Sequence, residues 1–218
     1  MPYKRENGKF VTDGSTIYFQ DTETHTFNAY YPYQAEGGTV TVSTAADKQG
    51  ADIDFLFASG ATGDTHNPTV SFTGDHAFHH CMSLIKFTFK AGDGVDFSQE
   101  KPASYTLSGL KHEGTFDTTT GTTAVTAENE SPITMQLGGA TTSQLIILPQ
   151  EVTTSPGLSV AYNDETYTTT LPQPSTGKFD TGYAYTYTIT LNNQSITVES
   201  PEITPWKAGD SNDASATL

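Results

Sequence analysis

The sequence contains one cysteine and only ten basic residues, and each scarcity excludes a class of protein. With Cys81 alone, no disulfide can form within the chain and no cysteine-rich zinc framework can be built. The ten Lys and Arg residues stand against 25 Asp and Glu residues, which gives a formal net charge of −15. Nucleic acids and anionic lipid surfaces are bound mainly through Lys and Arg. The charge balance therefore predicts that neither is a partner of this protein.

The sequence also lacks a long apolar run. No stretch of 18 apolar residues is present, so no membrane-spanning helix is predicted. No apolar segment follows residues 1–5 (MPYKR), so no signal peptide is visible there. Read literally, this indicates the cytoplasm, but removal of a leader before position 1 would leave the same pattern.

Threonine is the most abundant residue, with 38 copies, alongside 19 glycines and 11 prolines. Threonine, valine, tyrosine, phenylalanine and isoleucine all favour half-buried sheet surfaces. The alternation typical of β-strands recurs at residues 39–43 (TVTVS), 51–57 (ADIDFLF) and 183–191 (YAYTYTITL). The last of these is predicted to place Tyr183, Tyr185, Tyr187, Ile189 and Leu191 on one face, which is directed into the core. Residues 194–199 are predicted to pair with residues 183–191, across a turn at Asn192 and Asn193. Because no window of 11 or more residues follows a helical period, the chain is predicted to be all-β and of the sandwich class.

Residues 60–68 (GATGDTHNP) form the first break in this pattern that has the composition of a linker. We therefore predict a first, partial β-sandwich in residues 1–70 and a second β-sandwich in residues 71–207. Residues 208–218 are small and polar, and are predicted to be a flexible tail.

The strongest apolar segment is residues 78–89 (FHHCMSLIKFTF), and its apolar face changes near Leu84 and Ile85. A strand whose apolar face changes in this way either contains a β-bulge or is buried on both faces. The pattern alone leaves both interpretations open.

Several short segments follow one another from about residue 15 to residue 207. They are residues 27–33 (FNAYYPY), 54–58 (DFLFA), 67–72 (NPTVSF), 90–94 (KAGDG), 105–110 (YTLSGL), 114–117 (GTFD), 148–150 (LPQ), 185–192 (YTYTITLN) and 203–206 (ITPW). No one of them is specific, but in this order and spacing they together resemble the fimbrillin-like family of Bacteroidetes.

This resemblance implies two tandem transthyretin-like Greek-key β-sandwiches and a role as a stalk, anchor or tip subunit of a type V pilus. It further implies a precursor that is exported to the outer membrane as a lipoprotein and cut by a protease, with other fimbrial subunits as partners by strand exchange. The leader, the lipid-attachment Cys and the first strands of the family are not found in the sequence. The first sandwich is therefore expected to be truncated, with an open edge within residues 15–31 that accepts a strand from a neighbour.

A metal site is the most prominent chemical alternative, at residues 75–81 (DHAFHHC). Imidazole and thiolate groups suit zinc, but His79 and His80 would point to opposite faces of a strand. His25, His66 and His112 would have to complete the site. We expect instead a buried, unreactive Cys81 and no bound metal.

No catalytic or cofactor-binding residues are predicted. The sequence has no G-x-S-x-G motif, and Ser83 lies within a predicted core strand. The carboxylate pairs Asp52 with Asp54 and Asp164 with Glu165 are expected to be solvated strand edges and turns rather than a hydrolytic pair. The protein is therefore predicted not to be an enzyme.

Aromatic residues allow a second function. Tyr30, Tyr31 and Tyr33 beside Trp206 could form a platform for sugar rings, although core packing is the favoured interpretation. The alternative to a polymerising fimbrial subunit is thus a surface carbohydrate-binding or adhesive module that does not polymerise. Receptors or glycans at the cell surface are possible partners under either hypothesis. Residues 117–119 (DTT) also resemble a site for O-glycosylation.

Overall fold

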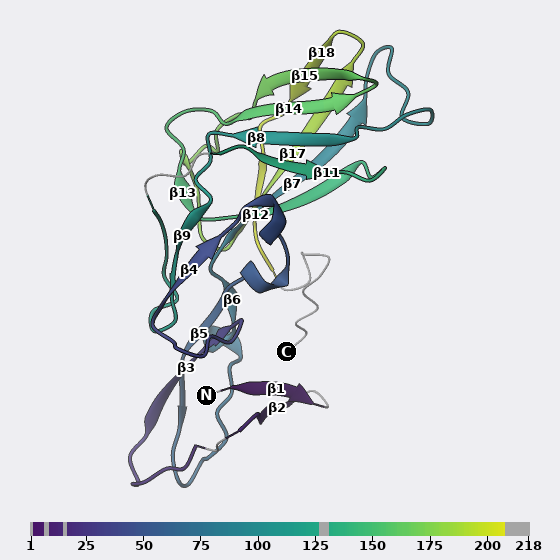
Figure 1. Cartoon of the computed structure of the whole chain (residues 1–218). Coiled ribbons are helices and arrows are strands. Elements are labelled where there is room, and N and C mark those ends of the chain that lie inside the picture. Colours follow the sequence, from purple (N-terminus) through teal and green to yellow (C-terminus); the bar gives the residue numbers. More distant parts are fainter. Residues whose placement is uncertain (1, 7–8, 15–16, 127–130, 208–218) are drawn as a thin grey trace.

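The computed structural model of the protein describes residues 2–6, 9–14, 17–126 and 131–207 (Figure 1). Over these residues the regular structure consists of β-strands and short 3-10 turns, and no α-helix is present among them. The predicted all-β class is confirmed. The predicted tail, residues 208–218, lies outside the described residues.

The elements follow one another along the chain in this order. They are β1 (Tyr3–Glu6), β2 (Lys9–Thr12), β3 (His25–Tyr31), β4 (Thr39–Ser43), η1 (Ala46–Lys48), η2 (Ala51–Ile53), β5 (Leu56–Gly63), η3 (Gly74–His76), β6 (His79–His80), β7 (Ser83–Ala91), β8 (Ser104–Ser108), β9 (Glu113–Asp117), β10 (Thr123–Val125), β11 (Ile133–Gln136), β12 (Thr142–Ile147), β13 (Gln150–Glu151), β14 (Gly157–Tyr162), β15 (Glu165–Thr170), β16 (Lys178–Phe179), β17 (Tyr183–Asn192), β18 (Ser195–Val198) and β19 (Glu202–Pro205).

Two sheets of this set share the larger hydrophobic core and are called here the large sheet pair. One sheet has the order β11-β8-β14-β15, and the other has the order β12-β7-β17-β18 with β19 also paired to β17. Strand β17 lies parallel to β7 and antiparallel to β18 and β19. Its alternating sequence directs one face inward, so the predicted register is confirmed for the residues that enter this core: Tyr185, Tyr187, Ile189 and Leu191. Tyr183, predicted on the same face, is instead 41% exposed at the start of the strand.

Two smaller sheets, β3-β5-β6 and β10-β9-β4, lie beside a second core and are called here the small sheet pair. Its pairing crosses residue 70 twice, because β4 pairs with β9 and β5 pairs with β6. The second core likewise draws Phe55 and Phe57 from before that residue and Phe116 and Trp206 from after it. The division of the chain into units at residues 70 and 71 stays a prediction, as does the Greek-key connectivity.

Strand β7 joins the two cores. Ser83, Leu84 and Ile85 are all buried, with Leu84 in the second core and Ile85 in the larger one. Of the two interpretations of this segment, burial on both faces is therefore confirmed. The strand begins at Ser83 rather than at residue 78, because His79 and His80 form β6 and pair with β5 instead.

Three other predicted element boundaries are also wrong. Residues 51–53 form the 3-10 turn η2, in which the Asp54 amide donates to the carbonyl of Ala51, so this strand begins only at Leu56. The break after β5 begins beyond Gly63 rather than at residue 60, because Ala61 is buried and pairs with Phe27. The β17–β18 turn is one residue later than predicted, since Asn192 already pairs with Ser195.

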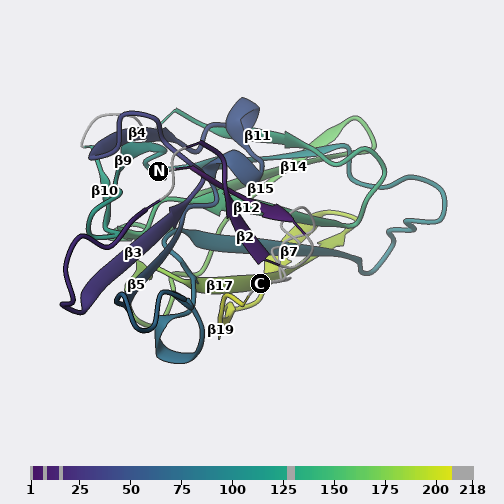
Figure 2. The same ribbon diagram turned by 90° about the horizontal axis from the view of Figure 1, so that it is seen from below.

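The elongated arrangement separates two ends of the molecule (Figure 1). Strands β14, β15 and β18 lie at one end, called here the distal end, and the paired strands β3 and β5 extend at the other. Figure 2, viewed from below, shows the paired strands β3 and β5 projecting to one side of the larger sheets. The β1–β2 hairpin forms a two-stranded sheet of its own.

Candidate interaction surfaces

Strand β3 is the edge of its sheet. It pairs with β5 along one side, and no strand among the described residues pairs with its other side. The register shifts between Phe27 and Ala29, and the Asn28 side-chain oxygen accepts a hydrogen bond from the amide of Gly60 at 3.3 Å. An open strand edge carries unpaired backbone N–H and C=O groups, which makes it a template for another strand. The expectation of an edge strand within residues 15–31 agrees with this arrangement.

Exposed aromatic and aliphatic side chains gather in the segment that contains this edge. Among the described residues, six large hydrophobic side chains are exposed, and four of these lie in residues 17–33. They are Ile17, Tyr18, Tyr31 and Tyr33, and Tyr18 is 79% exposed. Single exposed apolar residues are ordinary, so it is their concentration in the segment that contains an open strand edge that makes this segment a candidate interaction surface.

The chain around this edge is held by local contacts. Phe19 packs edge-on against Phe27, with ring centroids 5.9 Å apart, and lies 5.8 Å from the ring of His25. Asp64 accepts hydrogen bonds from the amides of His66 and Asn67, both at 2.7 Å. These two amides lower the pKa of the Asp64 carboxyl from its ordinary value. Phe19 thus holds the segment before β3 against the strand, and Asp64 shapes the turn that follows β5.

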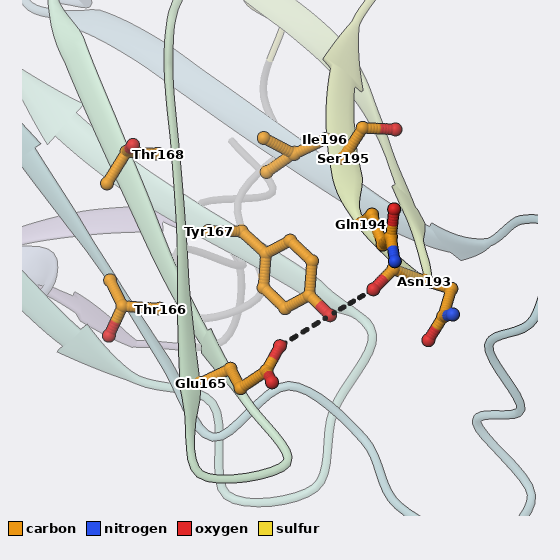
Figure 3. Close-up of a pocket in the computed structure, with 8 residues that line it drawn as sticks. All are labelled: Glu165, Thr166, Tyr167, Thr168, Asn193, Gln194, Ser195 and Ile196. Atoms are coloured by element: carbon orange, nitrogen blue, oxygen red, sulfur yellow. Dashed lines mark hydrogen bonds between the residues drawn. The ribbon is translucent and has the colours of Figure 1, made fainter.

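A pocket of about 450 Å³ lies at the distal end, between β15 and the turn that joins β17 to β18 (Figure 3). The ring of Tyr167 lies between β15 and β18. Its hydroxyl is 3.4 Å from a carboxylate oxygen of Glu165 and 3.4 Å from the carbonyl oxygen of Asn193. Burial is the largest cause of a raised Tyr167 pKa, and the Glu165 carboxylate adds to it. Gln194 and Ile196 complete the opposite wall.

The two strands that flank this pocket belong to different sheets and are not paired with each other. Tyr162 pairs with Glu165 across a two-residue turn, in which Asn163 and Asp164 have φ of 52° and 58°. In such a hairpin the bonded and non-bonded pairs alternate, so Thr166 and Thr168 direct their backbone groups away from β14. No described strand pairs with this side of β15, which thus offers backbone donors and acceptors at the pocket.

A second pocket, of about 560 Å³, lies on the outer face of β7, β12 and β17 beside residues 49–51. Lys86 contributes to its lining, together with Thr88 and Thr186. The Gln49 amide spans this junction, donating to the carbonyl of Ile146 at 3.0 Å and accepting from its N–H at 2.8 Å. This amide fixes the segment that follows β4 onto β12.

The residues considered as metal ligands do not converge. His79 is exposed, whereas His80 is buried and its Nδ1 lies 2.7 Å from Oδ1 of Asp54. Cys81 is fully buried, and burial raises its pKa to about 12, with a smaller effect from the Asp54 carboxylate. In the part of the chain that the structure describes, no group of three or more His, Cys, Asp or Glu side chains could hold a metal ion.

Asp54 forms a buried contact that the sequence patterns did not indicate. Its partner His80 stacks on Trp206, with ring centroids 3.8 Å apart and planes 4° from parallel. One Asp54 oxygen and the Trp206 indole nitrogen are buried and have no hydrogen-bond partner among the described residues. Trp206 is thus a core residue, 5% exposed, and does not form a surface platform with Tyr31 and Tyr33. Core packing, the favoured interpretation for Trp206, is what the structure shows.

The remaining candidates lie apart from one another. Asp52 is exposed on η2 while Asp54 is buried against His80, and Asp164 and Glu165 are exposed at the β14–β15 turn. Thr118, within the segment that resembles a glycosylation site, is only 6% exposed. Ser83 is buried and donates to the carbonyl of Asp180.

No helix among residues 2–6, 9–14, 17–126 and 131–207 is both long and apolar enough to cross a membrane.

A sequence profile described as fimbrillin-like matches residues 1–206. No curated protein sequence matches the chain.

Three solved structures resemble this one. A protein from Bacteroides ovatus, proposed to act in cell adhesion, is 31% identical, with 95% of this chain and 79% of that chain covered and a TM-score of 0.79. A protein from Bacteroides uniformis with the same proposed role is 26% identical, with 93% and 82% covered and a TM-score of 0.79. A fimbrial protein from Bacteroides vulgatus is 14% identical, with 94% and 84% covered and a TM-score of 0.59, and it bears on the fold alone.

Proposed function

The chain belongs to the fimbrillin-like family, and from this premise we propose that it is a subunit of a bacterial cell-surface fimbria that joins its neighbours by β-strand addition. The relatives from Bacteroides ovatus and Bacteroides uniformis, both proposed to act in cell adhesion, support a fimbrial or adhesive role at the cell surface. Such a role is structural and needs neither catalysis nor a cofactor. Other fimbrial subunits are the partners.

The single observation that carries this proposal is the open edge of β3 beside exposed aromatic side chains. A donor strand from a neighbouring subunit pairs with the free backbone groups of His25–Tyr31, and its alternate side chains cover the apolar surface. Many hydrogen bonds must break together to release such a strand, which makes the junction long-lived. Export of the precursor to the outer membrane as a lipoprotein belongs to the same proposal.

A lysine placed on this surface tests the proposal. Tyr31 is 43% exposed, so Tyr31→Lys leaves the isolated subunit folded but opposes the addition of a strand, since lysines protect natural sheet edges. We expect the yield of assembled fibres, seen by electron microscopy, to fall by about tenfold or more. Tyr183, 41% exposed, provides the matched control, and Tyr183→Lys should assemble normally. Normal assembly of the Tyr31→Lys protein would refute β3 as the acceptor.

Hydrogen exchange tests the strand pairing itself. Peptides that copy residues 2–14 and residues 195–207 serve as trial donor strands. A peptide that pairs with β3 should slow amide exchange mainly within His25–Tyr31. At a hundredfold excess over its dissociation constant it should stabilise the protein by about 3 kcal/mol. If no subunit terminal strand protects this edge or raises the melting temperature, the alternative of a non-polymerising surface module takes precedence.

A further inference from the structure

The distal pocket has a lining suited to a ligand other than a peptide strand. We propose that the pocket between β15 and the β17–β18 turn binds a neutral saccharide. Its volume of about 450 Å³ lies within the range of small-ligand pockets, roughly 300–1,000 Å³. The proposal stands independently of assembly at β3, because the two surfaces lie at opposite ends of the molecule (Figure 1).

The side chains of the pocket combine one aromatic ring with groups that both donate and accept hydrogen bonds. Tyr167 and Ile196 offer apolar surface, while Asn193 and Gln194 carry amides from the facing turn (Figure 3). The free backbone groups of β15 add further donors and acceptors. Sugar hydroxyls donate and accept equally, and the C–H faces of a sugar ring pack on aromatic rings. The lining therefore matches a polyhydroxylated ligand.

The charge of the pocket selects among saccharides. Glu165 is the only charged residue among the described residues that line it, and none of these is Lys or Arg. A carboxylate accepts hydrogen bonds from hydroxyls but repels sialic acid and sulfated sugars. The formal net charge of −15 also disfavours the binding of anionic ligands. The pocket is therefore expected to bind a neutral sugar.

The pocket is held in shape before any ligand arrives. The amide of Asn193 donates to the carbonyl of Asp93 at 2.8 Å, and the amide of Asp93 donates to the side-chain oxygen of Asn192 at 3.0 Å. Gly94 packs so closely that a Cβ there would lie 2.9 Å from that of Asn193. Rigid walls reduce the entropy lost on binding.

An extended peptide fits this pocket less well than a sugar does. The Tyr167 ring lies across the space between β15 and the facing turn, and its hydroxyl is 3.4 Å from the carbonyl oxygen of Asn193 (Figure 3). A strand that paired with β15 along its length would have to displace this ring. A compact ligand can rest against the ring instead.

The test is a glycan array that carries neutral mono-, di- and trisaccharides of glucose, galactose, mannose and their N-acetyl derivatives beside sialylated and sulfated glycans. We expect retention of at least one neutral glycan. When that glycan is titrated in heteronuclear NMR, its amide shifts should cluster at Glu165–Thr168 and residues 193–196. Retention of anionic glycans alone, or of no glycan at millimolar concentration, would overturn the proposal.

Substitutions locate the site. Tyr167→Ala and Gln194→Ala should each weaken binding by about tenfold, as truncation of central contact residues does. Tyr183→Ala and Gln20→Ala, at exposed positions elsewhere, are the matched controls and should bind as the unaltered protein does. Tyr167→Phe keeps the ring and the fold while removing the hydroxyl, and should weaken binding to a smaller extent.

Unchanged binding in both Tyr167→Ala and Gln194→Ala would place the glycan elsewhere and refute the proposal. So would NMR shifts produced by the trial strand peptides, rather than by sugars, in this pocket. Tyr31→Lys, which tests assembly, should bind the glycan normally. The two proposals can therefore fail separately.

Discussion

The side chain of Tyr187 both packs in the larger core and makes a hydrogen bond there. It is fully buried, its ring centroid lies 6.0 Å from that of Phe87, and its hydroxyl donates to the carbonyl of Pro172 at 3.0 Å. We expect Tyr187→Ala to lower the free energy of unfolding by about 3 kcal/mol or more, because it leaves a cavity. Thr186→Ala, on the opposite face of β17, should cost far less. Equal losses in urea denaturation would mean that the register is wrong by one residue.

Cys81 should make the free energy of unfolding depend on pH in the alkaline range. Burial raises its pKa from 9.0 to about 12, so the folded protein keeps a proton that the unfolded chain loses. The resulting stabilisation is complete below pH 9 and is lost as the pH rises towards 12. Between pH 8 and pH 10 this group should remove about 1.4 kcal/mol.

The matched control is Cys81→Ala, since both proteins share the buried tyrosines and differ only in the thiol. Denaturation curves at pH 8 and pH 10 should show the larger decline in the unaltered protein. Equal declines would indicate that the thiol ionises in the folded state as it does in the unfolded chain.

Single residues also show which structural features the sequence patterns are sufficient to predict. Tyr185, Tyr187 and Ile189 were placed correctly because a period of two along one strand fixes which face is buried. The contact of Asp54 with His80 was not predicted, since the two residues are 26 positions apart and lie in different elements. No local period records which distant side chains meet.

Among the elements, the β9–β10 hairpin is fixed to β5 by a glycine. Gly121 has φ of +71°, and a Cβ there would lie 2.4 Å from Cγ of Phe57. Gly121→Ala therefore combines left-handed backbone strain of about 1 kcal/mol with a steric clash in the second core. We expect a total loss of about 3 kcal/mol in thermal or chemical denaturation.

Gly138→Ala separates these two effects. Gly138 has φ of +57°, and a Cβ added there would meet no atom within 4 Å, so only backbone strain should result, at about 1 kcal/mol. If both variants lost the same stability, the contact between Gly121 and Phe57 would not constrain the hairpin.

Element pairing was predicted only where it is local. The β17–β18 hairpin follows from two alternating segments beside a short turn, and it was found one residue from its predicted turn. The pairing of β4 with β9 joins residues about 70 positions apart, as Ser43 with Glu113, and nothing in either segment specifies its partner. Residues 51–53 alternate like a strand but form η2, because Ile53 and Asp54 are both buried at a bend rather than on opposite faces of a sheet.

The whole molecule should unfold as one cooperative unit. Neighbouring residues of β7 and β17 enter different cores, with Leu84 and Ala184 in one and Ile85 and Tyr185 in the other. Neither core can lose these strands without exposing the other. Native-state labelling of Cys81 and hydrogen exchange along β17 should therefore report the same opening free energy as denaturant is added. Two distinct opening energies would show that the large and small sheet pairs unfold independently.

The stack of His80 on Trp206 has an optical consequence. Trp206 is the only tryptophan in the sequence, and its indole is in contact with the imidazole of His80. Such a contact quenches the fluorescence of an excited indole by charge transfer. The native protein should therefore emit weakly at short wavelength, and unfolding should make it brighter as well as red-shifted. Because Trp206 directly follows β19, detachment of that strand from β17 would raise the emission without any added dye. A native spectrum brighter than that in denaturant would show that the two rings do not stay in contact.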